Sequence, residues 1–234
     1  MKQTRLSAVL HDPMLRVIAT WIWWIVGGGL TMLALLTVLQ IKPGDFRILF
    51  REYPHLTIYI ETVGVGLLPL VITILCKDDL AAYGIQKKQM AKSLLLSSFV
   101  VILAYGFNFI RSGHWIYINT PNVHLDLPWN LWYAALGVFA YGPLEVFFVI
   151  WLIANTDKIF KGKDRNLSWG LILTVTLFGL AHLATTSWIM ALFVTVVFFL
   201  LGLIVKTTRN SIGPMVAWSL INTQVWFLAQ LLRS

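Results

Sequence analysis

Seven apolar segments follow one another along the chain, and each is long enough to cross a lipid bilayer as a helix. An α-helix rises about 1.5 Å per residue, so about 20 residues cross the roughly 30 Å hydrocarbon layer. The segments are residues 17–41, 56–76, 92–112, 130–154, 168–188, 189–205 and 212–232. We therefore predict an all-α protein, a polytopic membrane helix bundle of about seven transmembrane helices that forms a single integral membrane domain over residues 1–234. Between the fifth and sixth segments only Thr185-Thr186-Ser187 is polar, so a tight hairpin and a re-entrant turn fit equally well.

Composition and charge agree with residence in the bilayer. Hydrophobic residues make up 58% of the chain and charged residues 12%, and the mean hydropathy is +0.77, a profile typical of membrane proteins. The net charge of +8 does not indicate nucleic-acid binding, because Lys and Arg lie in short stretches between the apolar segments. With a cytoplasmic N-terminus, the inner connections hold 13 of the 18 Lys and Arg residues, as the positive-inside rule requires. We expect an integral membrane protein of the cell (plasma) membrane.

Two features exclude alternatives. Cys76 is the only cysteine, so an intrachain disulfide is impossible and thiolate metal clusters are excluded. The first apolar segment begins near Val17 and continues without a small-residue cleavage site, which favours a transmembrane helix over a cleaved signal.

Gly27-Gly28-Gly29 in the first segment, and Gly64 with Gly66 in the second, predict close helix packing.

The long connection between the third and fourth segments carries His114, His124 and Asp126. Imidazole and carboxylate groups suit zinc or copper, so a metal site is conceivable there. The spacing matches no compact ligand motif, however, and we expect a solvated loop. Glu61, in the second segment near its outer end, either pairs with His55 or reaches toward the membrane surface, and its role is left open.

Three strongly polar residues lie well inside predicted helices: Glu145 in the fourth, His182 in the fifth and Asn222 in the seventh. A lone acid at a helix centre costs roughly 2.5 kcal/mol or more in lipid, so Glu145 should face a protein interior or a wet cavity. The three residues are therefore expected to converge. Convergence also fits a structural role, in which Glu145 is hydrogen-bonded to His182 and holds two helices together.

The same three residues offer hydrolytic chemistry. A carboxylate in an apolar pocket can act as a general base toward water, and an imidazole can orient that water or shuttle its proton. An amide such as that of Asn222 can donate a hydrogen bond to a developing oxyanion.

The order and spacing of these residues resemble the CPBP family of intramembrane proteases, which includes the CAAX prenyl proteases and bacteriocin-processing enzymes. That family carries E-E-x-x-x-R on one helix, F-x-x-x-H on a later helix, and H-x-x-x-N or H-x-x-x-D near the end. The second motif is intact as Phe178-Gly179-Leu180-Ala181-His182. Tyr83-Gly84-Ile85, followed by Lys87-Lys88, is similar to the amphipathic lead-in of the family, so the resemblance covers about residues 83–222. It implies catalytic roles for Glu145, His182 and Asn222.

The chain departs from the family pattern at three positions. Val146 stands at the second Glu, Ile150 at the Arg, and Trp218 at the His of the last motif. Loss of a Glu and an Arg together removes a buried ion pair without leaving an unpaired charge. One His, one Glu and one Asn fall short of the usual three zinc ligands, so we predict neither zinc nor another cofactor. The three bulky residues also argue against water access to Glu145.

The sequence leaves two functions open. The first is an intramembrane endopeptidase in which Glu145 activates water, with a membrane peptide as substrate. The second is a catalytically inactive homologue, a pseudoenzyme that acts as a binding or assembly subunit of a membrane protein complex. A transporter ranks last, because the two halves of the chain show no evident inverted repeat.

Overall fold

The computed structural model describes residues 10–115, 125–162, 165–222 and 224–231, and within these ranges every regular element is a helix. Five helices are long and apolar enough to cross a membrane: Pro13–Val38, His55–Leu75, Met90–Ser112, Trp129–Ile159 and Trp188–Thr208. The predicted all-helical bundle is confirmed, and these five helices indicate an integral membrane protein. The number of crossings and the orientation remain predictions.

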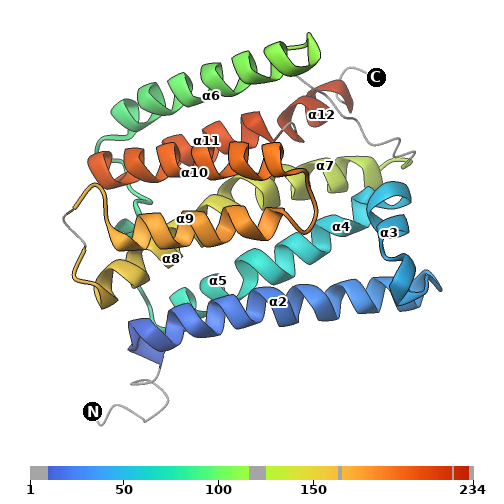
Figure 1. Cartoon of the computed structure of the whole chain (residues 1–234), viewed down its shortest axis with the longest axis horizontal. Helices are drawn as coiled ribbons and strands as arrows, with labels where there is room; N and C mark the ends of the chain where they lie inside the picture. The colour runs from blue at the N-terminus through green and yellow to red at the C-terminus, as the bar shows by residue number, and fades with distance from the viewer. Residues whose placement is uncertain (1–9, 116–124, 163–164, 223, 232–234) are drawn as a thin grey trace.

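One helix lies at the centre of the bundle. α8 (Glu145–Ile159) contacts α2 (Pro13–Val38), α9 (Trp169–His182) and α11 (Ile212–Ile221). In Figure 1, α2 lies at one side of the bundle and α6 (Met90–Ser112) at the other. In the most apolar stretch of residues 129–159, 72% of the residues are buried, whereas in the most apolar stretch of α2 only 17% are. The outer helices therefore present apolar side chains to the lipid, whereas α8 forms the core.

The fifth and sixth predicted segments form two packed antiparallel helices, α9 and α10 (Trp188–Thr208) (Figure 1). The Ser187 side chain caps α10 by accepting a hydrogen bond from the backbone N–H of Met190. The Thr186 hydroxyl donates to the carbonyl of His182 at 2.9 Å. The polar residues at this break therefore satisfy the backbone groups of the turn.

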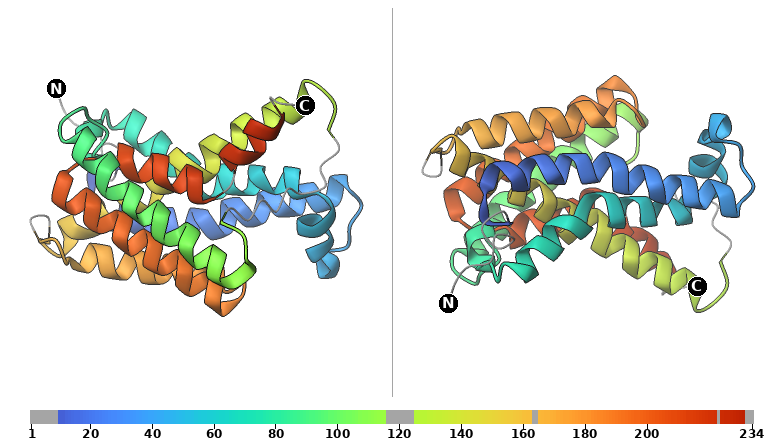
Figure 2. Two further views of the ribbon diagram at one scale, coloured as in Figure 1. Left: turned by 90° about the horizontal axis from the view of Figure 1, so that it is seen from above. Right: turned by 90° about the horizontal axis from the view of Figure 1, so that it is seen from below.

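The seventh predicted segment is not one helix. α11 ends at Ile221, and α12 (Gln224–Leu231) begins after it. α12 packs against α7 (Trp129–Phe139), and Figure 2 shows these two helices side by side. Asn222 is the residue that follows the last turn of α11. At membrane depth, a break in a helix is tolerated where the backbone is buried in protein or lines a cavity. The break thus places the polar residue Asn222 at the end of a helix.

Two of the long helices contain a π-helical segment. Residues 55–75 consist of α4 (Pro54–Glu61), the segment Thr62–Leu67 and α5 (Leu68–Leu75). Residues 129–159 consist of α7, the segment Ala140–Leu144 and α8. Such turns are rare and occur frequently at functional sites.

Gly28, Gly64 and Gly66 allow the close packing that was predicted for them, whereas a Cβ atom on Gly29 would meet nothing within 4 Å. A Cβ atom on Gly64 would lie 3.1 Å from the Cα atom of Gly28. A Cβ atom on Gly66 would overlap the side chain of Leu144. The first two long helices, and the two π-helical segments, therefore approach as closely as glycine permits.

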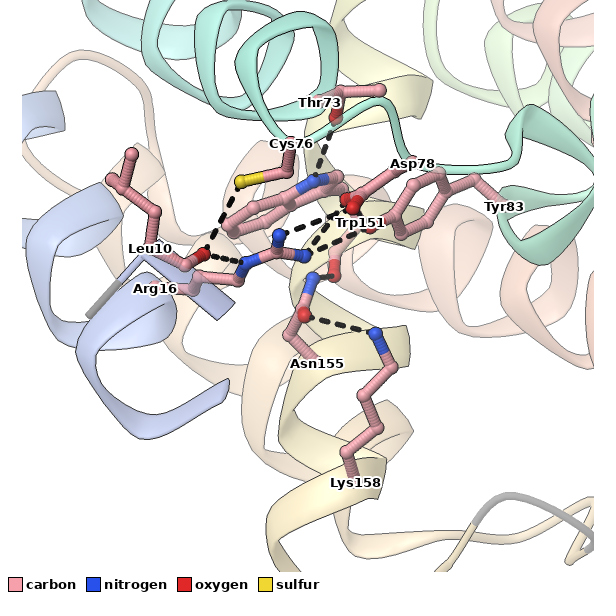
Figure 3. Close-up of polar contacts among 9 residues, drawn as sticks. All are labelled: Leu10, Arg16, Thr73, Cys76, Asp78, Tyr83, Trp151, Asn155 and Lys158. Atoms are coloured by element: carbon pink, nitrogen blue, oxygen red, sulfur yellow. Dashed lines mark hydrogen bonds and ion pairs between the residues drawn. The ribbon is translucent and has the colours of Figure 1, made fainter. Parts of the chain in front are cut away.

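An ion pair joins α2 to the connection after α5 (Figure 3). The guanidinium of Arg16 meets the carboxylate of Asp78 with two hydrogen bonds, 2.8 Å from Nη1 to Oδ2 and 3.1 Å from Nη2 to Oδ1. The hydroxyl of Tyr83 donates to the same Oδ2 at 2.6 Å. Burial raises the pKa of Asp78, but the hydrogen bonds from Arg16 and Tyr83 outweigh it and hold this pKa below its ordinary value.

The ion pair lies against the far end of α8. The guanidinium carbon of Arg16 lies 5.9 Å from the ring centroid of Trp151, and Trp151 Nε1 donates to Thr73 Oγ1 at 3.1 Å (Figure 3). One turn further on, Asn155 Nδ2 donates to the carbonyl of Trp151 at 2.8 Å. These contacts hold α8 at its middle and one turn further from Glu145.

Candidate active site

A cavity of about 640 Å³ opens between the helices and reaches Glu145. Its walls come from α2, α4, α6, α9, α10 and α11, together with the turn between α9 and α10. The polar side chains that line it are those of Thr57, Glu61, Asn108, Arg111, Tyr141, Glu145, His182, Thr185, Thr186, Trp218 and Asn222. All three residues predicted for the site therefore border one space.

Glu145 is the first residue of α8 and directly follows a π-helical segment. Its side chain is 3% exposed. Its Oε2 accepts a hydrogen bond from Trp218 Nε1 at 2.6 Å and a longer one from Asn222 Nδ2 at 3.5 Å. Both bonds end on the same oxygen, so Oε1 is left for a molecule in the cavity.

His182 is the last residue of α9 and is half-buried. Its Nδ1 lies 2.8 Å from the carbonyl oxygen of Phe178, and the two rings meet edge to face with centroids 4.7 Å apart. A carbonyl can only accept, so the proton sits on Nδ1 and Nε2 is an acceptor. The four-residue spacing of the F-x-x-x-H motif thus sets the orientation of the imidazole. Between the described side chains of Glu145 and His182 there is no direct hydrogen bond, contrary to the purely structural role.

Asn222 lies at the end of α11. Besides its contact with Glu145, its Nδ2 donates to the carbonyl of Tyr141 at 3.4 Å. Both distances are at the long limit for hydrogen bonds, so this amide is held weakly and can turn toward another acceptor.

The three departures from the family pattern differ in where they lie. Val146 is 1% exposed and belongs to the packed core, and Ile150 borders a second cavity of about 430 Å³ beside Lys206. Neither residue is part of the wall around Glu145. Trp218 alone of the three lines the site. Of the three residues expected to keep water from Glu145, only Trp218 borders the cavity, and the cavity still reaches Glu145.

Glu61 is the site residue that sequence reasoning did not assign. It ends α4, lines the same cavity and interacts electrostatically with Glu145 and Tyr141. One signal was available, because Glu61 is an acid inside an apolar segment that is followed by Gly64 and Gly66. The suggested pairing with His55 did not point to a role at this site, and Glu61 belongs to no motif.

In the described part of the chain, the acids and the imidazole of the cavity do not form a compact group of three possible metal ligands. Among the described residues, three potential ligand groups come within 4.8 Å of one another only at His11, Cys76 and Asp78, outside this cavity. There the carboxylate of Asp78 is already bound by Arg16. The metal site suggested for the connection between the third and fourth apolar segments is not tested, because His124 lies outside the described residues. His114 and Asp126 are exposed.

Together, the fold and the cavity define a helical integral membrane protein with a carboxylate, an imidazole and an amide at one internal site. Residues 126–224 match the family model Type II CAAX prenyl endopeptidase Rce1-like, in agreement with the resemblance that the motifs indicated. The match includes Glu145, His182 and Asn222 but not Glu61 or the stretch Tyr83-Gly84-Ile85. No curated protein and no solved structure matches the chain.

Proposed function

We propose that the protein is an intramembrane endopeptidase of the CPBP type that hydrolyses a peptide bond in a membrane peptide. The observation that carries this proposal is the cavity that reaches Glu145 and is also lined by His182 and Asn222. The match of residues 126–224 to a CAAX prenyl endopeptidase family model supports the same reaction class.

Each group has a role that its geometry allows. Glu145 Oε1 accepts a proton from a cavity water, and the resulting hydroxide attacks the peptide carbonyl carbon. Nε2 of His182 accepts a hydrogen bond from that water and orients it, because Nδ1 is occupied by Phe178. The weakly held amide of Asn222 donates to the oxyanion that forms on the carbonyl oxygen. Trp218 keeps Oε2 hydrogen-bonded throughout.

Reconstitution into lipid nanodiscs with a fluorogenic transmembrane peptide tests this function. We expect cleavage by the wild-type protein and a loss of about a hundredfold or more in Glu145→Gln, because the general base is gone. Glu52→Gln removes the same charge from an exposed position of α3 (Arg47–Glu52) and serves as the control. Wild-type cleavage no faster than that of Glu145→Gln would contradict the proposal.

One observation favours the alternative, a catalytically inactive homologue that acts as a binding or assembly subunit. Trp218 stands where the family has a His, and its indole is bonded to Glu145. In that case the Glu145–Trp218 bond is structural, and Glu145→Gln and His182→Ala leave co-purifying membrane proteins unchanged while no variant cleaves peptide. Affinity purification of wild type and both variants, followed by mass spectrometry, distinguishes the two functions.

A further inference from the structure

Glu61 lies in the hydrocarbon-spanning part of residues 55–75, where an acid costs roughly 2.5 kcal/mol or more unless it faces protein or water. Its side chain is half-buried and borders the cavity that Glu145 borders from the opposite helix. The family match begins at residue 126, so Glu61 lies outside the region that resembles known proteins. Its presence in this cavity needs an explanation of its own.

The two acids lie on opposite sides of the contact between their helices. Glu61 immediately precedes the π-helical segment Thr62–Leu67, and Glu145 immediately follows the segment Ala140–Leu144. These two segments contact each other, and Gly66 packs directly onto Leu144. The acids therefore lie on either side of the contact between the two π-helical segments, and each borders the cavity.

The groups that face the two acids do not neutralise them. The other titratable or charged residues on the cavity wall are Tyr141, His182 and Arg111, and Arg111 is exposed. The ion pairs of Arg16 and Lys206 are made with Asp78 and Asp157, away from this cavity. Two carboxylates that border one cavity and interact electrostatically across it cannot both ionise at low cost, so one of them retains a proton.

We propose that Glu61 is the second acid of this cavity and that Glu61 and Glu145 form a carboxylate pair that shares one proton. If the proposed peptidase function holds, the pair both accepts the proton of the attacking water and donates a proton to the leaving group. Glu145 takes a proton from the attacking water, and protonated Glu61 gives its proton to the leaving amine nitrogen as the C–N bond breaks. The proton on Glu145 then returns to Glu61, so the pair ends the cycle with the one proton that it held at the start.

The carboxylate pair can be tested without any activity. Difference infrared spectroscopy of the protein in nanodiscs follows the carboxyl C=O band as pH changes, and Glu61→Gln and Glu145→Gln assign its components. If the acids share a proton, the wild type titrates in two steps and each variant in a single step whose midpoint matches neither wild-type step. If each variant removes one step and leaves the other at its wild-type midpoint, the acids are independent and the proposal is wrong.

Kinetics test the role of Glu61 in the reaction. With the transmembrane peptide, Glu61→Gln should lower kcat by about tenfold or more with little change in KM, and should remove one limb of a bell-shaped pH profile. Glu61→Asp should retain that limb, and Glu52→Gln should have the wild-type profile. A Glu61→Gln profile that keeps both limbs would exclude this residue as the acid. If no protein cleaves, the peptidase function fails, and the infrared titration still decides whether the pair exists.

Discussion

At the scale of single residues, Trp218 decides how Glu145 is held. Its indole N–H can only donate, and it donates to Glu145 Oε2 over 2.6 Å inside the buried part of the site. A charged acceptor in such a place is stabilised more by a hydrogen bond than a neutral one would be. Trp218, which departs from the family pattern, thus still donates a hydrogen bond to Glu145, the acid that the pattern requires.

Replacement of Trp218 by Phe should therefore destabilise the protein. The ring is retained, but Glu145 loses its shortest hydrogen bond, which costs about 1–3 kcal/mol. Thermal unfolding in detergent measures this loss as a lower Tm. Trp218→His keeps a donor of smaller size and should unfold at a higher temperature than Trp218→Phe. Equal Tm values for the Phe variant and the wild type would show that the hydrogen bond contributes nothing.

The sequence predicted three of the site residues for a physical reason. Glu145, His182 and Asn222 are polar groups that lipid disfavours, and they stand in motifs with defined spacing. Glu61 was not assigned, because it stands in no motif and its partner lies on a helix far away in the sequence. The hydrogen bond from Trp218 was also not predictable, since a Trp in an apolar segment usually serves to pack or to anchor.

At the scale of elements, the contact between the two π-helical segments determines where both acids lie. Gly66→Ala should be costly, because the new Cβ atom would overlap Leu144 and force the segments apart. We expect a loss of about 1–3 kcal/mol in stability, with a parallel loss of peptide cleavage. Gly29→Ala is the matched control, since a Cβ atom there meets nothing within 4 Å. Thermal unfolding of both variants measures the difference, and equal Tm values would rule out a tight contact.

The ion pair between α2 and the connection after α5 should make stability depend on pH. The pKa of Asp78 is lowered in the folded protein, so its contribution is complete above the unfolded value of about 3.9 and is lost as pH falls through the folded value. Asp78→Asn leaves the buried Arg16 without its counter-charge and should cost about 3 kcal/mol at neutral pH. The Tm difference between wild type and Asp78→Asn should shrink as the pH falls below 4. A constant difference would mean that the ion pair does not contribute.

At the scale of the whole molecule, hydropathy predicted where the apolar helices lie better than how long they are. α9 has 14 residues and α11 has 10, both short of the roughly 20 that a full crossing needs. Hydropathy did not reveal the break after Ile221, because apolar residues continue on both sides of the short polar stretch Asn222-Thr223-Gln224. The break is a tertiary feature, at which Asn222 reaches the cavity while α12 packs on α7.

The orientation of the whole bundle gives the last prediction. The excess of Lys and Arg in alternate connections predicts that residue 161 lies inside the cell and residue 126 outside. In a Cys76→Ser background, a membrane-impermeant maleimide should label Asp126→Cys in intact cells but label Lys161→Cys only after permeabilisation. Arg111, at the end of α6 that precedes the outer connection, lines the cavity, so this orientation opens the cavity toward the outer face. The reverse labelling pattern would turn the cavity toward the cytoplasm, and a peptide substrate would then have to enter from that side.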